Sequence, residues 1–293
     1  MEWLKRLNEA IDYVEDNLEN TLSYDEAARI ACCSTFYFQR IFSYVCGVSL
    51  SEYIRRRRMT QAAFALQRKD AKIIDIALKY GYNSPTAFNR AFQSVHGISP
   101  SAARKRGIVL NAYPAIRLCV QIAGGERMSY RIVRKSAMRV VGLRTPLAED
   151  MEKNHRTIPA FWAKVFGSDA FATICRLSNQ QPRKILGVSI YEGPQKMFYA
   201  IAAQTEQPVP RGMFAYEIPA ATWVVFENSG SFQEDVQSVF RRFFTEWLPF
   251  SGYAYAGLPD IEVYPVCGEF PAAGNSEVWI AIKESEEDEK CGI

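Results

Sequence analysis

The sequence predicts an α + β multidomain protein, in which an all-α domain of two helix-turn-helix units precedes an α+β domain with antiparallel sheet. Three observations carry this prediction. Residues 24–108 contain a repeated helical pattern, residues 129–293 change to the alternating pattern of strands, and 293 residues suffice for two cores. We place the all-α domain at residues 1–108, a linker at residues 109–128 and the α+β domain at residues 129–293.

Charge is unevenly divided along the chain. Residues 24–108 contain 14 Lys and Arg against 5 Asp and Glu, a net of +9, whereas residues 129–293 contain 17 against 20, a net of −3. Such asymmetry is typical of a chain in which one segment binds a polyanion. No signal peptide precedes the first helical pattern, and the apolar runs are too short to span a membrane. We therefore expect a cytoplasmic protein without a membrane partner.

The cysteines and histidines do not form a metal-binding pattern. Seven cysteines are scattered, no CxxC motif occurs, and the two histidines, His96 and His155, lie far apart. A zinc site or a disulfide framework requires closer spacing than this. We expect reduced thiols, no metal and no cofactor.

The clearest motif is an internal repeat with a period of fifty residues. Nine identities occur over 25 aligned positions, and in the first copy they are Asp25, Ala27, Ser34, Phe38, Arg40, Phe42, Val45, Gly47 and Ser49. Each copy predicts a helix, a turn and a second helix. The second helices begin at Ser34 and Ser84 and end at Gly47 and Gly97, which are preferred capping residues.

The second helix of a helix-turn-helix unit can enter the major groove of duplex DNA. Arginine can form paired hydrogen bonds with guanine, and asparagine or glutamine with adenine. The alternative is that Arg40 and Arg90 are ordinary surface arginines, but their equivalent positions in both copies favour DNA contact. The candidate DNA-binding residues are Thr35, Phe36, Gln39 and Arg40 in the first copy, and Pro85, Thr86, Asn89 and Arg90 in the second.

Residues 50–66 predict one helix between the two copies. A rigid connector would fix the distance between the recognition helices, and one turn of B-DNA is about 34 Å. We therefore expect a monomer to bind two successive segments of double-stranded DNA. The run Arg55–Arg58 covers every side of this helix, and the sequence leaves open which of these arginines contact phosphate.

Residues 5–106 closely resemble the DNA-binding domain of AraC/XylS-type regulators. The residues that carry the resemblance are Ile73–Ala77, Gly81-Tyr82, Phe88-Asn89-Arg90, Phe92, Gly97-Ile98-Ser99-Pro100 and Arg58-Met59-Thr60-Gln61-Ala62. The resemblance implies that both second helices insert into the major groove, so that the candidate residues contact bases or backbone.

The remainder of the chain predicts two related halves of the order β-β-α-β-β. The expected strands and helices are residues 130–134, 139–143, 156–166 (helix), 185–191 and 197–203, then 213–218, 222–227, 232–247 (helix), 261–265 and 277–283. Helices are expected to cover one face of an antiparallel sheet.

Strand alternation predicts an aromatic face around one carboxylate. We expect Ile261 and Val263 to point toward the helices, and Glu262 and Tyr264 to point away from them. The candidate ligand-binding residues are Glu262, Tyr264, Trp279, Tyr199, Tyr191, Trp223 and Trp162. Aromatic rings and a carboxylate suit a flat, apolar, cationic or amphipathic small molecule. The alternative is that these aromatic residues form core and that Glu262 is exposed or salt-bridged.

Residues 129–284 are similar to GyrI-like effector-binding domains. The residues that carry this likeness are Ile158-Pro159-Ala160-Phe161-Trp162, Leu186-Gly187-Val188, Ile218-Pro219-Ala220, Glu246-Trp247-Leu248-Pro249, Pro259–Tyr264 and Glu277-Val278-Trp279-Ile280. The resemblance implies that Glu262 lies at the bottom of the ligand cleft. The domain order matches regulators of the Rob type, which implies a transcription regulator controlled by a small-molecule effector.

Two other functions for the second domain remain open. One is a hydrolase-like enzyme that uses Glu262, although the chain has no familiar catalytic motif and no histidine beside Glu262 in the sequence. The other is a module that only docks partners such as RNA polymerase. We expect a DNA-binding regulator rather than an enzyme.

Overall fold

The computed structural model describes residues 2–68, 72–105, 107–119, 127–148, 151–179, 183–192, 196–228, 234–266 and 276–284. The chain divides into two compact units, residues 1–122 and residues 123–293, and each is described by itself.

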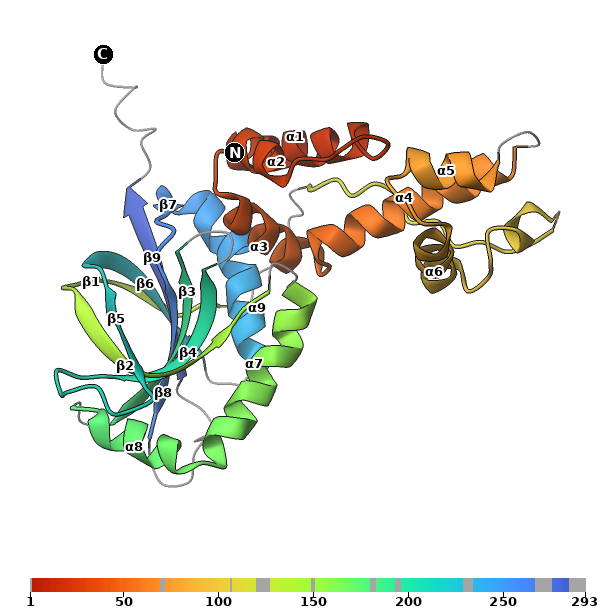
Figure 1. Cartoon of the computed structure of the whole chain (residues 1–293). Helices are drawn as coiled ribbons and strands as arrows, with labels where there is room; N and C mark the ends of the chain where they lie inside the picture. The colour runs from red at the N-terminus through yellow and green to blue at the C-terminus, as the bar shows by residue number, and fades with distance from the viewer. Residues whose placement is uncertain are drawn as a thin grey trace, which may run out of the picture. The chain divides into compact units, whose positions relative to one another are not determined.

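The regular elements described in the first unit are all helices (Figure 1). Its helices are α1 (Glu2–Asp16), α2 (Tyr24–Ile30), α3 (Thr35–Cys46), α4 (Leu50–Leu66), α5 (Ile73–Lys79), α6 (Pro85–His96) and the 3-10 turn η1 (Ala102–Arg104).

Capping residues define both helix-turn-helix units as the sequence predicts. The Ser34 and Ser84 side chains accept hydrogen bonds from the backbone N–H groups three residues later, at the starts of α3 and α6. Gly47 and Gly97 end these helices with φ values of 67° and 74°, a left-handed conformation that glycine adopts without steric cost. The fifty-residue repeat is therefore a structural duplication.

The turns inside the two units differ at one position. The α5–α6 turn contains Gly81 with a φ of 81°, whereas the α2–α3 turn contains Cys32 with a φ of 52°. Cys32 is a non-glycine residue in the left-handed region, where the Cβ atom crowds the backbone. The first turn is therefore the more strained of the two.

Helix α4 packs against both copies. Its Met59 and Ala63 lie in one buried cluster with Phe88 and Phe92 of α6. At its other end, Tyr53 lies against Phe42 of α3, with ring centroids 5.2 Å apart. The predicted connector is thus part of the core, which makes it rigid.

The second unit is one antiparallel sheet with helices. Its elements are β1 (Tyr130–Lys135), β2 (Met138–Pro146), α7 (Met151–Phe166), α8 (Asp169–Leu177), β3 (Lys184–Tyr191), β4 (Met197–Gln204), β5 (Phe214–Ile218), β6 (Ala221–Asn228), α9 (Glu234–Arg242), the π-helical turn η2 (Phe243–Trp247), the 3-10 turn η3 (Leu248–Phe250), β7 (Tyr253–Tyr255), β8 (Asp260–Pro265) and β9 (Ser276–Glu284).

The strand order shows that the two halves exchange their first strands. The order is β1-β6-β9-β8-β3-β4-β2-β5, and β7 pairs with β9 beside this path. Strand β1 of the first half pairs with β6 of the second, while β5 of the second half pairs with β2 of the first. The halves also meet at the centre, where β3 pairs with β8.

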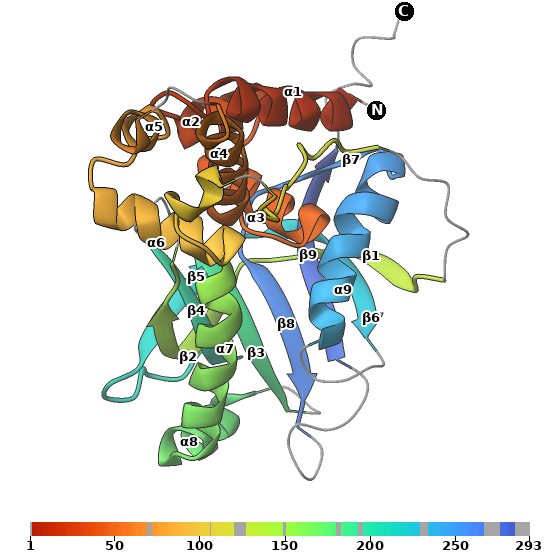
Figure 2. The same ribbon diagram turned by 90° about the vertical axis from the view of Figure 1, so that its right-hand side faces the viewer.

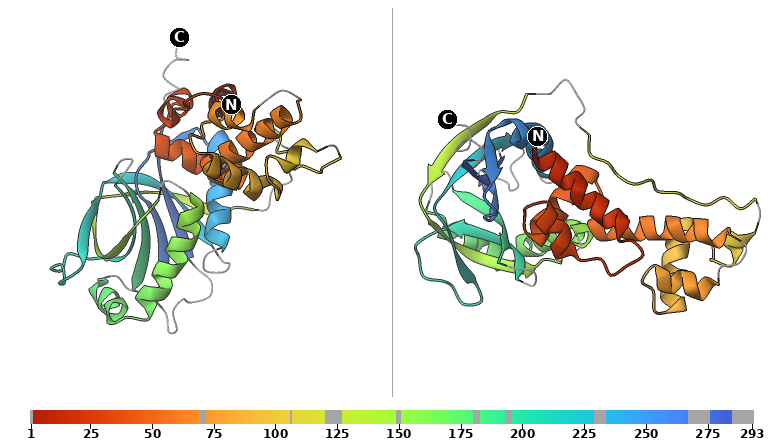
Figure 3. Two further views of the ribbon diagram at one scale, coloured as in Figure 1. Left: turned by 45° about the vertical axis from the view of Figure 1, so that its right-hand side comes forward. Right: turned by 90° about the horizontal axis from the view of Figure 1, so that it is seen from above.

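Helices α7 and α9 lie on the same face of the strongly curved sheet (Figures 2 and 3). The strands match the predicted segments within a few residues, but the sequence analysis missed α8 and β7. The first half is therefore β-β-α-α-β-β rather than β-β-α-β-β. Residues on the face away from these helices, such as Val188 and Ile261, are also fully buried.

Candidate functional site

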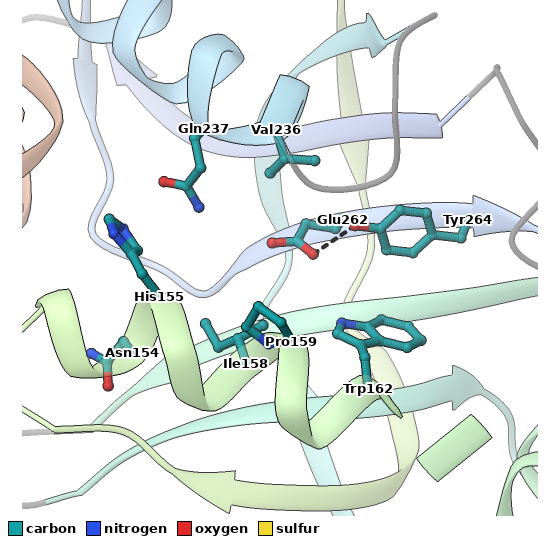
Figure 4. Close-up of a pocket in the computed structure, with 9 residues that line it drawn as sticks. All are labelled: Asn154, His155, Ile158, Pro159, Trp162, Val236, Gln237, Glu262 and Tyr264. Atoms are coloured by element: carbon teal, nitrogen blue, oxygen red, sulfur yellow. Dashed lines mark hydrogen bonds between the residues drawn. The ribbon is translucent and has the colours of Figure 1, made fainter. Parts of the chain in front are cut away.

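A pocket lies between α7, α9 and strand β8 of the second unit (Figure 4). Helix α7 contributes one face, because its lining residues recur at helical spacing. The pocket is lined by Asn154, His155, Ile158, Pro159, Trp162, Val236, Gln237, Glu262 and Tyr264. Glu262 is the carboxylate among these residues, and it comes from the sheet that forms the floor.

Glu262 is held by two tyrosine hydroxyls. Tyr199 donates to Glu262 Oε2 at 2.6 Å, and Tyr264 donates to the same oxygen at 2.8 Å. Trp162 Nε1 in turn donates to the Tyr199 hydroxyl at 3.0 Å. Hydrogen bonds from neutral donors to a carboxylate are shorter and stronger than neutral pairs, so this network fixes the position of the carboxylate.

Both tyrosines remain protonated donors. Burial, reinforced by the nearby Glu262 carboxylate, raises the pKa of Tyr199 well above its ordinary value. The same two causes, with burial the larger, raise the pKa of Tyr264. Ionising either phenol would bring a second negative charge beside Glu262 in a dry site. The two phenols therefore add no negative charge of their own to the pocket floor.

Gly187 makes the close contact possible. It lies directly opposite Glu262 in the β3–β8 pair. A Cβ atom on Gly187 would be 2.1 Å from the Tyr199 hydroxyl oxygen and 2.7 Å from Glu262 Oε2. Any other residue at this position would displace the hydrogen-bonded pair.

The second oxygen of Glu262 points to the side of the pocket where His155 and Gln237 lie (Figure 4). The walls next to it are apolar, formed by Ile158, Pro159 and Val236. A carboxylate with apolar walls binds a positive group strongly, because little water competes for the charge. The arrangement suits a small ligand with an apolar body and a cationic group.

The predicted orientation of strand β8 is wrong, because Ile261 and Val263 point away from the helices and Glu262 and Tyr264 point toward them. Glu262, Tyr264 and Tyr199 face the helices, since Trp162 of α7 contacts both tyrosine rings. Ile261 lies on the opposite face, with Trp279 as its direct partner across the β8–β9 pair. Directly opposed residues share a face, so Trp279 cannot lie beside Glu262.

Four of the seven predicted ligand residues therefore do not line the pocket. One of them, Tyr199, is fully buried and reaches the site only through its hydrogen bond to Glu262. Trp223 and Trp279 contact each other in the core cluster of the other sheet face, with ring centroids 6.3 Å apart. Tyr191 is half-buried at the end of β3 and does not line the pocket. These residues could not be assigned from alternation, because both faces of the sheet are buried and apolar.

His155 is the main residue that the sequence analysis missed. It lies far from Glu262 in the sequence, yet both line the same pocket. His155, Ile158, Pro159 and Trp162 occupy positions i, i+3, i+4 and i+7 of α7, which is one helix face. This spacing could have identified the wall, starting from Trp162.

The predicted DNA-binding residues differ between the two copies. On α6, Pro85, Thr86 and Arg90 are exposed and Asn89 is half-buried, so this helix presents the predicted side chains to solvent.

On α3, Thr35 and Phe36 are half-buried, and the Thr35 hydroxyl donates to Asp25. Gln39 and Arg40 expose only 8% and 2% of their surface, and the Arg40 guanidinium lies 5.3 Å from the centre of the Tyr44 ring. DNA contact by Gln39 and Arg40 stays a prediction, and it requires that both side chains become accessible.

Comparisons with known proteins match both units. Residues 128–283 match the GyrI-like small molecule binding domain, and residues 27–106 match a helix-turn-helix domain. The HTH-type transcriptional activator AarP of Providencia stuartii is 42% identical over 98 residues, which are 33% of this chain and 73% of AarP. The chain belongs to the AraC-type regulators and carries a GyrI-like domain.

Two further proteins are similar to parts of this regulator. The multiple antibiotic resistance protein MarA of Salmonella typhimurium is 33% identical over 98 residues, 33% of this chain and 77% of MarA. A solved protein bound to tetraphenylphosphonium is 20% identical with a TM-score of 0.48, over 53% of this chain and 94% of that one.

The regulator thus combines DNA binding with control by a small molecule. Within the part of the chain that the structure describes, no helix has the length and apolar character needed to cross a membrane.

Proposed function

We propose that the effector is a small molecule with an apolar body and one positive charge, and that Glu262 is its counter-charge. The observation that carries this proposal is the carboxylate held by Tyr199 and Tyr264 at the floor of the pocket, with the apolar walls of Ile158, Pro159 and Val236 next to it. Trp162 offers an aromatic face beside it, and such faces attract cations. His155 lies on the same α7 face, two turns before Trp162.

The test compares two probes of equal shape. Phenyltrimethylammonium is a permanent cation, and tert-butylbenzene is its uncharged isostere. We expect the wild-type regulator to bind the cation at least about tenfold more tightly, since a paired charge in an apolar site contributes more than about 1.4 kcal/mol. Glu262→Gln should remove this preference while retaining tert-butylbenzene binding. Equal affinity of the wild type for both probes would refute the cation proposal.

We also propose that α6 inserts into the major groove, with Arg90 and Asn89 reading base edges and Thr86 and Pro85 close to the DNA. The exposure of Pro85, Thr86 and Arg90 in the first half of a capped second helix supports this proposal. Helix α3 would enter the neighbouring groove segment with Thr35, Phe36, Gln39 and Arg40. A monomer then supplies both recognition helices.

The operator can be obtained by selecting duplex fragments with the purified regulator. On the selected site, Arg90→Ala should weaken binding by about 1–3 kcal/mol and relax base preference at one position. Lys105→Ala, which removes an exposed charge outside α6, should weaken selected and random DNA to the same extent. Equal losses on selected and random DNA for Arg90→Ala would mean that Arg90 contacts only phosphate.

A further inference from the structure

Residues 107–119 follow the last helix of the DNA-binding unit, and the sequence predicts most of them as a linker. In the structure they lie along α1 and α4, and we call them the strap. The Asn8 side chain of α1 forms two hydrogen bonds with Leu118 of the strap, both at 2.9 Å. Its Nδ2 donates to Leu118 O, and its Oδ1 accepts from Leu118 N. Ile116 N donates to the Tyr53 hydroxyl at 3.1 Å.

The strap is also attached at its first half. Tyr113 N donates to the Thr60 hydroxyl at 3.1 Å, and the Asn111 side chain donates to Val95 O at 2.7 Å. Leu110 and Tyr113 pack against the apolar cluster between α4 and α6. A plain spacer would be solvated, whereas this segment places side chains and backbone in specific contacts.

Arg57 of α4 joins the strap to both helices. Its Nη1 donates to Tyr113 O at 2.5 Å, and its Nη2 donates to Glu15 of α1 at 2.6 Å. The Tyr53 hydroxyl donates to the same glutamate at 2.7 Å. The side chains of Arg57 and Glu15 expose only 9% and 17% of their surface. A buried ion pair with this many hydrogen bonds is sensitive to the loss of either partner.

The neighbouring arginines also bind within the unit. Arg55 binds Glu52 and Ser94 of α6, and Arg56 binds Glu52 and lies 5.0 Å from the centre of the Tyr113 ring. Arg58 donates to Asn20 O in the α1–α2 turn. Four consecutive residues point to different sides of a helix. Arg56 and Arg57 reach the strap, Arg55 reaches α6 and Arg58 reaches the α1–α2 turn. The arginines Arg55–Arg58 therefore hold α4 in place against its neighbours within the DNA-binding unit.

We propose that Arg57 is a positioning residue for DNA recognition, because it anchors the strap that keeps α1 and α4 in the arrangement needed by the two recognition helices. The strap is the stretch of chain through which the DNA-binding unit continues toward the sensor. Release of the strap lowers DNA affinity, and DNA binding in return favours the bound strap, since coupling between two equilibria is reciprocal.

The test uses the full chain and the DNA fragment that the wild type selects. Glu15→Gln with Arg57→Met removes both charges, so that no orphan charge remains buried. We expect about tenfold weaker binding, the usual size of such coupling. The dependence of affinity on salt should be unchanged, because Arg57 contacts no phosphate. Glu19→Gln with Lys79→Met is the matched control, an exposed ion pair outside the strap, and should bind as the wild type does.

Asn8→Ala is a second variant, and it should fold normally because alanine favours helix. Of the hydrogen bonds described above, it loses only the two with Leu118. We expect it also to bind the fragment more weakly. In the wild type, the amide protons of Tyr113, Ile116 and Leu118 should exchange more slowly when DNA is bound. Unchanged exchange at these amides, or wild-type affinity in Asn8→Ala, overturns the proposal. A weaker salt dependence in the Arg57 variant also overturns it, because it would place Arg57 on phosphate.

Discussion

At the scale of single residues, Gly187 decides how closely Tyr199 can approach Glu262. Gly187→Ala places a methyl group where the Tyr199 hydroxyl lies, 2.1 Å from its oxygen. The tyrosine must move, and the carboxylate then loses one of the donors that fix it. We expect Gly187→Ala to weaken phenyltrimethylammonium binding by about tenfold or more, the loss of one charge-assisted hydrogen bond. Calorimetric titration measures this change.

Gly167→Ala is the matched control for that substitution. Gly167 follows α7, and a Cβ atom there would meet Ala163 O at 3.7 Å, an ordinary contact. It should bind the probe as the wild type does. If both alanine variants bind normally, the fit around Glu262 is looser than the structure indicates.

His96 makes the stability of the regulator depend on pH. Burial lowers the pKa of His96 below its ordinary value of 6.5, although a hydrogen bond with Met59 O at 3.0 Å opposes this shift. Below about pH 6.5 the unfolded chain therefore binds a proton that the folded chain does not. Stability is complete above this pH and falls as the pH decreases, by at most about 1.4 kcal/mol per pH unit.

Urea unfolding at pH 7.5 and pH 5.5 tests the role of His96. His96→Gln should reduce the difference between the two midpoints. His155→Gln, which changes the other histidine of the chain, is the comparison variant, and the reduction should be larger for His96→Gln. The reverse pattern would show that His155 is the group responsible.

At the scale of elements, the two helix-turn-helix units differ in the backbone strain of their turns. Cys32 has a φ of 52° and is exposed, so its side chain contributes little packing. Cys32→Gly relieves the left-handed strain, about 1–2 kcal/mol, but adds freedom to the unfolded chain, about 0.4–1 kcal/mol. We expect a net stabilisation of roughly 0.5–1 kcal/mol, measured by thermal unfolding.

Ala31→Gly provides the control for this turn. Ala31 has a φ of −73°, which every residue adopts. Glycine there adds only unfolded-state freedom, so the variant should unfold at a lower temperature. If Cys32→Gly also lowers the melting temperature, the turn is not strained.

The sequence predicts the bounds of the helices and strands better than it predicts on which face of the sheet a side chain lies. Serine caps, glycine ends and the fifty-residue spacing are local signals, and they place α3, α4 and α6 within about one residue. The face of Glu262 depends instead on how β8 is aligned with β9 and β3. Alternation gives two sets of side chains, but because both faces of this sheet are buried it cannot say which set meets the helices.

At the scale of the whole molecule, one chain contains two helix-turn-helix units, each with a capped second helix. We expect one regulator to bind one DNA fragment, and the strength of binding to depend on the spacing between the two half-sites. Analytical ultracentrifugation of the selected fragment with the regulator measures the stoichiometry. Two chains on one fragment would show that each chain uses only one recognition helix. Inserting five base pairs between the half-sites, about half a turn, should abolish tight binding.

The pocket is a property of the whole second unit. Helix α7 of the first half supplies His155 and Trp162, while β8 of the second half supplies Glu262. A single sequence shows the chemical types, such as a carboxylate among aromatic residues. It does not show which distant helix faces them, since this depends on long-range strand pairing. Of the lining residues, Glu262, Tyr264 and Trp162 were therefore predicted, whereas His155 of α7 and the α9 wall were missed.

The exchanged first strands of the sensor have a consequence for synthesis on the ribosome. Tyr130 of β1 pairs with Phe226 of β6, so β1 leaves the exit tunnel almost a hundred residues before its partner. Until then its hydrogen-bonding edge is open to other nascent chains, and unpaired edges promote aggregation. Strand β1 carries three positively charged side chains, Arg131, Arg134 and Lys135. These charges should keep the strand soluble until β6 has been synthesised.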